Sequence, residues 1–236
     1  MAKLTPELSV FFPTYNEEGN IFKTVLSAKK VLEDTTDKWE IIIVNDGSKD
    51  KTREISQSLS ENDSRIKLVN HSSNRGYGAA FKTGFYSSKY NWIAFTDSDG
   101  QFDFSEITNF IDKQRETGAD LVIGYYKDRK VSFSKKVTSK IWEYLVFLLF
   151  GLKVRDIDCG FKLVSKKVID ALPNLESERG AFISSEFLIK AKKKGFKIVE
   201  IPVTHHPRLQ GHGTGRNLNV IIQSFKDLLR LWKKLN

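Results

Sequence analysis

The chain has 236 residues, 40% of them hydrophobic and 28% charged, which is long enough for a sizeable core and ordinary for a globular protein. Its single cysteine, Cys159, excludes an internal disulfide and fits a reducing compartment. The N-terminus lacks the apolar core of a signal peptide. The longest apolar patch, residues 141–152, would reach about 18 Å as a helix, short of a hydrocarbon core of roughly 30 Å. We therefore expect a cytoplasmic protein without a transmembrane helix.

The net charge of +9 is unevenly distributed along the chain. Residues 1–126 hold 15 Lys and Arg against 19 Asp and Glu, whereas residues 127–236 hold 23 against 10. A strongly basic second half predicts an anionic partner such as a phosphate, a nucleic acid or a membrane surface.

Apolar runs alternate with helical patterns in the first half of the chain. The expected strands are 8–13, 39–44, 66–70 and a run that begins at Trp92. Helices are expected from Asn16, from Asp50 and after Gly78, and Asn16 followed by acidic residues is a typical helix start. The alternation indicates an α/β fold with a doubly wound, mostly parallel sheet. Ligands of such sheets bind outside the carboxyl ends of the strands.

The pattern loosens past residue 104. Strands are expected over 121–124 and 197–203 and helices over 139–152 and 184–194, with a polar, basic loop over 125–136. An apolar stripe predicts an amphipathic helix over 217–236. No interdomain linker is evident. We expect one domain over 1–216, with halves near 1–103 and 104–216, before the C-terminal helix.

The stretch 92–103 carries the clearest chemical signal. An apolar run ends in Asp97 and Asp99, followed by Gly100 and Gln101. Two carboxylates and an amide oxygen suit Mg²⁺ or Mn²⁺ with positions left open for phosphate oxygens. The alternative is an ordinary acidic turn with capping aspartates. Residues 13–15 and Asp46 also fall at predicted strand ends, which favours the metal.

The glycine loop 74–78 is not a dinucleotide fingerprint. The third glycine of that pattern would fall at Phe81, and no phosphate-binding G-x-x-x-x-G-K-[ST] loop is present.

Six short motifs together resemble those of family-two glycosyltransferases with a GT-A fold, a Rossmann-like sheet flanked by helices. Within this family the chain is most similar to polyprenyl-phosphate sugar synthases of the dolichol-phosphate-mannose-synthase-like group. The motifs are Pro13-Thr14-Tyr15-Asn16-Glu17, Asn45-Asp46-Gly47-Ser48, Asn74-Arg75-Gly76-Tyr77-Gly78, Asp97-Ser98-Asp99-Gly100-Gln101, Asp158-Cys159-Gly160-Phe161-Lys162 and Ser185-Glu186-Phe187-Leu188.

The resemblance implies an inverting transfer from a nucleotide-sugar, with Asp97 and Asp99 as catalytic residues. Metal binding by Mg²⁺ or Mn²⁺ is implied at Asp97, Asp99 and Gln101. The residues implied to bind the nucleotide-sugar are Pro13, Tyr15, Glu17, Val44, Asp46, Ser98, Asp99, Gln101 and Arg208. The family usually has aspartate where this chain has Asn45, so we expect an altered base preference.

The acceptor implied by the resemblance is a polyprenyl phosphate, dolichyl or undecaprenyl. A phosphomonoester with a second pKa of roughly 6 needs cations rather than a general base. Arg129, Lys135 and Lys136 precede the apolar helix, and Ser139 is expected at its N-terminus, where anions are favoured. Docking on the cytoplasmic face of an anionic membrane would rest on helix 139–152, the C-terminal helix and basic charge. A membrane-protein partner is a further candidate.

Two rival functions remain. A soluble GT-A enzyme acting on a saccharide or another hydroxyl acceptor would have the same catalytic half but would bury the apolar residues 141–150 in its core. A basic nucleic-acid-binding module would explain the charge but not the acidic strand ends, so no nucleic acid is expected as partner. A metal site at His205, His206 and His212 is disfavoured, because a His-His-Pro sequence in a basic loop more often contacts phosphate.

Overall fold

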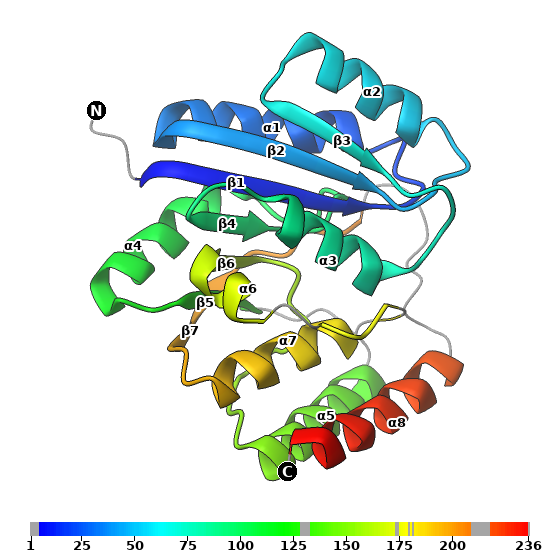
Figure 1. Cartoon of the computed structure of the whole chain (residues 1–236), viewed down its shortest axis with the longest axis vertical. Helices are drawn as coiled ribbons and strands as arrows, with labels where there is room; N and C mark the ends of the chain where they lie inside the picture. Colours follow the sequence, from blue (N-terminus) through cyan, green and yellow to red (C-terminus); the bar gives the residue numbers. More distant parts are fainter. Residues whose placement is uncertain are drawn as a thin grey trace.

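The computed structural model describes residues 5–127, 133–172, 175–178, 180, 182–208 and 218–235 (Figure 1). These residues build one seven-stranded sheet in the order β3-β2-β1-β4-β6-β5-β7. β6 runs antiparallel to β4 and β5, and the other neighbours pair in parallel. The predicted mostly parallel α/β sheet is therefore confirmed.

The strands are β1 Thr5–Thr14, β2 Thr36–Asn45, β3 Ile66–Asn70, β4 Trp92–Phe95, β5 Leu121–Tyr126, β6 Lys162–Ser165 and β7 Ile198–Val203. The helices are α1 Ile21–Thr35, α2 Thr52–Asn62, α3 Tyr77–Ser87, α4 Ile107–Thr117, α5 Phe133–Phe150, α6 Lys166–Ala171, α7 Phe182–Lys193 and α8 Leu218–Leu235. A short 3₁₀ helix, η1, spans Phe104–Glu106.

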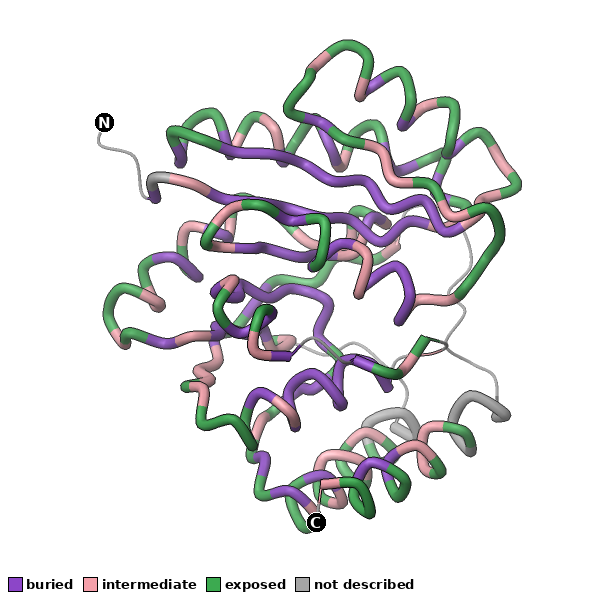
Figure 2. Tube along the Cα trace, viewed as in Figure 1, coloured by how far each residue is buried: buried purple, intermediate pink, exposed green. Residues whose placement is uncertain are grey.

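The sheet has a hydrophobic core on each face, because its central strands are apolar on both sides (Figure 2). One face packs against α1, α2 and α4, with Val25, Leu59 and Phe110 among the buried residues. The other face packs against α3, α6 and α7, and α5 and α8 add a further layer beside α7 (Figure 1). Burial on both faces stabilises the sheet. Ligands are therefore left the loops at the ends of its strands.

Two expected helix starts were wrong, and one helix was missed. The first helix begins at Ile21 rather than near Asn16, and Asn16 instead takes a left-handed backbone conformation with φ of 55°. Helix α5 begins at Phe133, six residues before the expected start, so Ser139 lies inside the helix and not at its N-terminus. Helix α4 was not expected, because only a few of its residues are apolar.

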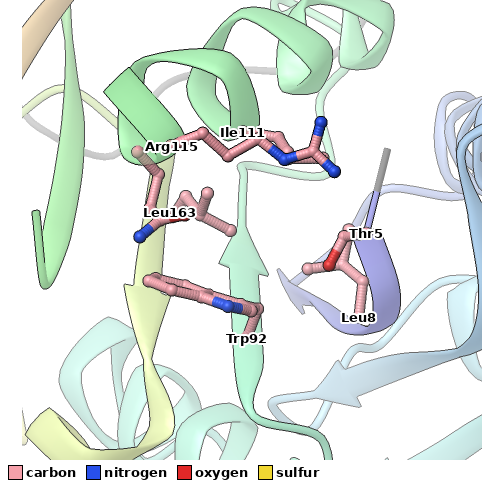
Figure 3. Close-up of a pocket in the computed structure, with 7 residues that line it drawn as sticks. Thr5, Leu8, Trp92, Ile111, Arg115 and Leu163 are labelled. Atoms are coloured by element: carbon pink, nitrogen blue, oxygen red, sulfur yellow. The ribbon is translucent and has the colours of Figure 1, made fainter. Parts of the chain in front are cut away.

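A hollow of about 160 Å³ lies at the amino ends of β1 and β4, beneath α4 (Figure 3). It is lined by Thr5, Leu8, Trp92, Ile111, Gln114, Arg115 and Leu163. Since ligands of parallel sheets bind at the carboxyl ends of the strands, this hollow lies away from the expected site. Among the residues that the structure describes, no helix has the length and apolar composition needed to cross a bilayer.

Candidate active site

The acidic motifs meet at the carboxyl edge of the sheet. β1 lies between β2 and β4, and Thr14 pairs with Asn45 at the ends of β1 and β2. The hydroxyl of Ser98 donates to the carbonyl oxygen of Pro13 at 2.9 Å, and the Thr24 hydroxyl donates to the carbonyl oxygen of Ser98 at 3.2 Å. These bonds tie the acidic turn after β4 to the end of β1.

The loops after β1 and β2 interlock through side chain to backbone bonds. The amide of Lys49 donates to Asn16 Oδ1 at 2.8 Å, and the amide of Asn16 donates to the Ser48 hydroxyl at 3.0 Å. The amide of Glu17 donates to the Thr52 hydroxyl at 2.8 Å. The left-handed Asn16 lets the chain turn between the two loops, so Glu17 is held at the start of the site.

Asp97 is partly buried in the turn after β4. Its pKa is raised to about 7, mainly because burial disfavours the charged form and also because Asp99 is close. The Tyr77 hydroxyl lies 3.4 Å from Asp97 Oδ1. A Cβ atom at Gly160 would lie 2.2 Å from Asp97 Oδ2, so only glycine allows the chain before β6 to approach the carboxylate so closely.

A fully buried cation supports this carboxylate from β6. Lys162 pairs with Phe95 across the β4–β6 ladder, and its ammonium lies 5.3 Å from the Phe95 ring centroid. The ammonium donates to the carbonyl oxygen of Cys159, and its charge opposes the rise in the pKa of Asp97. Burial in turn lowers the pKa of Lys162. The charge of Lys162 only partly offsets the effects of burial and Asp99, since the pKa of Asp97 is still raised.

Arg208 bridges two acidic groups of the site. Its guanidinium contacts Glu17 Oε1, and its Nη2 lies 3.7 Å from Asp99 Oδ2. Asn20 Nδ2 donates to the other Glu17 oxygen at 2.7 Å. The pKa of Glu17 is nevertheless raised, because burial outweighs these partners. The Arg208 Nε is buried without a partner among the described residues.

Gln101 is held by the strand end after β7. Its side-chain Nε2 donates to the carbonyl oxygen of His206 at 3.0 Å, and the amide of His206 donates to the carbonyl oxygen of Gln101 at 2.8 Å. The His205 ring packs edge-on between Phe102 and Tyr126, at centroid distances of 5.4 and 4.5 Å. His205 thus packs against aromatic rings, and His212 lies outside the described residues, so the disfavoured histidine metal site gains no support.

Asp46 anchors the glycine loop. Its Oδ1 accepts the amide of Arg75 at 2.9 Å, and its Oδ2 accepts the amide of Gly76 at 2.8 Å. Gly47 permits this docking, because it has φ of +67° and a Cβ there would lie 2.5 Å from the carbonyl carbon of Ser73. The acidic residue at the end of β2 therefore organises the glycine loop.

The structure brings together most of the residues predicted to bind the donor. Glu17, Asp99 and Arg208 are in contact or close range, and Asp97 and Gln101 lie on the same turn. The Val44 side chain is fully buried in the core, and the Ser98 hydroxyl donates to the carbonyl oxygen of Pro13.

The predicted acceptor residues are only partly described. Arg129 lies outside the described residues, and Lys135 and Lys136 fall in α5 with side chains that are not described. Ser139 is half-buried inside α5. Its predicted place at a helix N-terminus is wrong because the helix continues upstream to Phe133.

Sequence reasoning assigned no role to Tyr77 or Lys162 and did not mention His71. Tyr77 and Lys162 belong to the motifs 74–78 and 158–162, and this membership could have indicated that they lie in the site. His71 follows directly after β3 at the carboxyl edge of the sheet, and that position was its signal.

The donor atoms of the acidic turn fit a hard divalent cation. Asp97 and Asp99 present carboxylates close enough to raise the pKa of Asp97, and a cation would relieve that repulsion. Among the described residues the amide oxygen of Gln101 accepts no hydrogen bond, since the side chain bonds through Nε2. Within the same residues no cluster of three or more His, Cys, Asp or Glu could hold a metal. A metal bound by Asp97 and Asp99 would therefore take its third protein ligand from another residue type, such as the amide oxygen of Gln101.

Comparison with known proteins defines the class. The structure of glucosyl-3-phosphoglycerate synthase from Mycobacterium tuberculosis in complex with Mn²⁺, uridine diphosphate and phosphoglyceric acid superposes with a TM-score of 0.71 at 19% identity, covering 98% of this chain and 79% of that one. The likeness establishes the fold, and the predicted GT-A architecture is confirmed. The model of glycosyl transferase family 2 matches residues 9–172. The chain belongs to this family.

Relatives with assigned names are similar over most of this chain. Glycosyltransferase AglD of Haloferax volcanii is 29% identical over 97% of this chain and 37% of its own length. Dolichyl-phosphate beta-glucosyltransferase of Saccharomyces cerevisiae is 31% identical over 84% of this chain and 66% of its own. Dodecaprenyl-phosphate galacturonate synthase of Rhizobium johnstonii is 28% identical, with coverages of 92% and 64%. The chain thus spans between about a third and two thirds of these proteins.

Proposed function

We propose that this chain transfers a sugar from a nucleotide-sugar to a polyprenyl phosphate, with inversion, at the cytoplasmic surface of a membrane. The names of two relatives, a dolichyl-phosphate glucosyltransferase and a dodecaprenyl-phosphate galacturonate synthase, support the acceptor class.

One observation carries the proposal: α5 exposes an apolar stripe. Val137, Ile141, Tyr144 and Leu148 follow helical spacing and are 41%, 52%, 63% and 63% exposed. The opposite side of the helix is in the core, where Val146 is fully buried. A soluble enzyme was expected to bury residues 141–150 as core. The exposed stripe favours insertion into the boundary of a bilayer.

Helix α8 extends this surface with apolar and basic residues. Leu229 and Trp232 are 54% and 38% exposed, and Lys226, Arg230 and Lys233 are exposed on the same helix. The Phe225 ring packs edge-on against Trp142 of α5 at 5.2 Å, so the two helices lie side by side. Apolar residues beside basic ones suit an anionic lipid surface.

The donor is assigned to the carboxyl edge of the sheet. Asp97, Asp99 and Gln101 would hold Mg²⁺ or Mn²⁺, which would neutralise charge on the leaving nucleoside diphosphate. Structures of similar fold with Mn²⁺ and uridine diphosphate are consistent with this. Arg208 can donate in bidentate fashion to phosphate oxygens. The nucleoside would be held by Tyr15, Glu17, Asp46 and the backbone near Pro13 and Val44. The backbone near Ser98 would contact the diphosphate.

The acceptor phosphate is assigned to Arg129, Lys135, Lys136 and Ser139. β5 ends at Tyr126, whose ring stacks on Phe102 at 6.1 Å, so the chain leaves the carboxyl edge six residues before α5 begins. A phosphate held there would enter the site while its tail follows α5. Phosphate oxygens are already ionised near neutral pH, so the transfer needs cations rather than a base.

The hydrogen bonds of Glu186 agree with a transfer in which this residue does not act as a general base. Its carboxylate accepts the amides of Glu176 and Ser177, both at 2.8 Å, and the ammonium of Lys190 at 2.6 Å. The residue is 2% exposed. The carboxylate in the motif 185–188 therefore anchors a loop and is not placed to accept a proton from an acceptor.

A donor screen tests the proposal. Nucleotide-sugars are incubated with Mn²⁺ and the protein, each with and without a polyprenyl phosphate, and sugar-linked lipid is detected by mass spectrometry. We expect lipid-dependent consumption of one donor. Equal transfer to a soluble saccharide or phosphoglycerate without lipid would establish the soluble alternative instead.

Vesicle flotation tests the membrane surface with a matched control. Ile141→Ser combined with Leu148→Ser should abolish most binding to vesicles of phosphatidylethanolamine and phosphatidylglycerol. Phe22→Ser with Leu26→Ser removes two exposed apolar residues, 51% and 41% exposed, from one side of α1 on the other face of the sheet and should leave binding unchanged. Equal loss in both pairs would reject α5 as the docking surface.

Kinetics test the acceptor residues. Arg129→Ala or Lys135→Ala should raise the apparent KM for polyprenyl phosphate and leave hydrolysis of the donor by water intact. Loss of donor hydrolysis with unchanged acceptor KM would move these residues to the donor site.

A further inference from the structure

His71 lies behind the donor edge of the sheet, between Asp46 and α3. Its amide donates to the carbonyl oxygen of Asn45 at 2.9 Å, which continues the β2–β3 pairing one residue past the end of β3. The side chain is 6% exposed. Its Nδ1 lies 2.7 Å from Asp46 Oδ1 and its Nε2 lies 2.9 Å from the Thr83 hydroxyl. The imidazole is thus held at both nitrogens.

The acceptor positions of Asp46 are almost all used. Oδ1 receives His71 and the amide of Arg75, and Oδ2 receives the amide of Gly76. Each carboxylate oxygen offers about two acceptor positions. Among the described residues one position on Oδ2 therefore remains, and its direction is fixed because rotation of the carboxylate would break three hydrogen bonds.

Thr83 holds the His71 ring in place, and the ring in turn holds the Asp46 carboxylate. A carboxylate oxygen accepts hydrogen bonds, so the ring nitrogen that faces Asp46, Nδ1, is the donor of that bond, and Nε2 exchanges a hydrogen bond with the Thr83 hydroxyl. A flip of the ring would place carbon atoms at both partners. The chain Thr83–His71–Asp46 therefore links helix α3 to the docked glycine loop 74–78, which begins that helix.

We propose that His71 is a positioning residue of the nucleotide site. It holds the Asp46 carboxylate so that the glycine loop stays docked and the remaining Oδ2 position accepts a hydrogen bond from the nucleoside of the donor. The inference rests on the proposed function, since it requires a nucleotide at this edge. His71 acts through Asp46 and does not itself contact the ligand. Because the contact is made in the ground state, its loss should raise the donor KM and leave kcat unchanged.

Calorimetry on the full chain tests the role of His71, with UDP and GDP as probes in the presence of Mn²⁺. We expect His71→Ala to weaken binding of the preferred diphosphate about tenfold, or roughly 1.4 kcal/mol. His71→Asn should recover most of the affinity, because its amide nitrogen can donate to Asp46 from near the position of Nδ1. His71→Gln, of similar polarity but with its amide nearer the position of Nε2, should not. Thr83→Val, which keeps the first bond, should change Kd by less than His71→Ala.

The outcomes separate the two levels of the argument. Absence of diphosphate binding by the wild-type protein would overturn the donor assignment and this role with it. Wild-type binding with unchanged affinity in His71→Ala would overturn only the role of His71. Equal losses of diphosphate affinity in His71→Asn and His71→Gln, at equal melting temperatures, would also overturn the role of His71. A fall in kcat at constant donor KM in His71→Ala would overturn it as well.

Discussion

Glu40 and Asp97 lie near opposite ends of the strands, and the pKa values of their carboxylates are shifted in opposite directions. At the amino edge, Glu40 is fully buried, yet its pKa is lowered. It accepts the Ser9 hydroxyl at 2.7 Å, the Lys89 amide at 2.8 Å and the Lys67 ammonium at 2.7 Å. At the carboxyl edge, the pKa of Asp97 is raised to about 7 and that of Glu17 is also raised.

The difference lies in how far each carboxylate is compensated. Donors surround Glu40, and together they outweigh the desolvation that opposes ionisation. Asp97 has the Tyr77 hydroxyl at 3.4 Å and the partial effect of Lys162, and it faces a second carboxylate. Glu40 is therefore held ionised by its donors, whereas Asp97 and Asp99 form a poorly compensated pair whose repulsion a bound cation would relieve.

The largest expected effect concerns the metal role of Asp99. Asp99→Asn should lower kcat/KM by about 100-fold or more, because a charged ligand to the ion is lost while the apolar strand behind it keeps the fold. Turnover of the donor found in the screen, measured at limiting Mn²⁺, provides the check. Near-normal turnover would remove the metal role from Asp99.

The next effect concerns stability at the amino edge. Glu40→Ala leaves the Lys89 amide and Ser9 hydroxyl without their acceptor, so it should lower the free energy of unfolding by about 2–3 kcal/mol. Chemical denaturation measures this. Donor affinity should stay at the wild-type value, and a loss of affinity larger than the loss of folded protein would erase the distinction between the edges.

The pH dependence of stability should have opposite signs at the two edges. The pKa of Glu40 is lowered from 4.5, so its stabilisation exists above that value and is lost as pH falls through the folded pKa. The pKa of Asp97 rises from 3.8 to about 7, so ionisation costs stability as pH rises across that range. In chelator, Asp97→Asn should therefore raise the melting temperature more at pH 8 than at pH 4.

The two variants serve as each other's control in that experiment. The destabilisation by Glu40→Ala should shrink as the pH falls below about 4.5, the pKa expected in the unfolded chain. Parallel pH profiles for Glu40→Ala and Asp97→Asn would show that the two carboxylates are compensated alike.

The smallest effect concerns Ser98. Its hydroxyl is bonded to the carbonyl oxygen of Pro13, so Ser98→Ala should cost about 1 kcal/mol of stability. Donor affinity should change by less than about threefold, which is less than 0.7 kcal/mol. A loss of affinity much greater than this would show that the Ser98 hydroxyl contacts the donor.

The sequence predicted the carboxyl edge because its signal is local. Apolar runs ending in Pro13, Asn45 or Asp97 indicate parallel strands whose polar ends share an edge, and the structure places them side by side. The antiparallel β6 could not be read in this way, because its direction depends on pairing with β4 and β5. Helix α4 has too few apolar residues for periodicity to reveal it.

Side-chain direction was less predictable than position. Val44 and Ser98 lie at the expected strand ends, but the first points into the core and the second to Pro13. Likewise, Glu40 and Lys162 give no sign in the sequence of being buried, since their partners lie on other strands or turns. Tertiary contacts decide which carboxylates are compensated, and the sequence alone does not state them.

The most direct test of the contrast between the edges is an anomalous diffraction map of crystals grown with Mn²⁺ and the preferred nucleoside diphosphate. We predict a single manganese peak bound by Asp97, Asp99 or both, with Gln101 nearby and phosphate oxygens completing the coordination. A bound nucleotide without manganese at this turn, or manganese at the amino edge beside Glu40, would contradict the account.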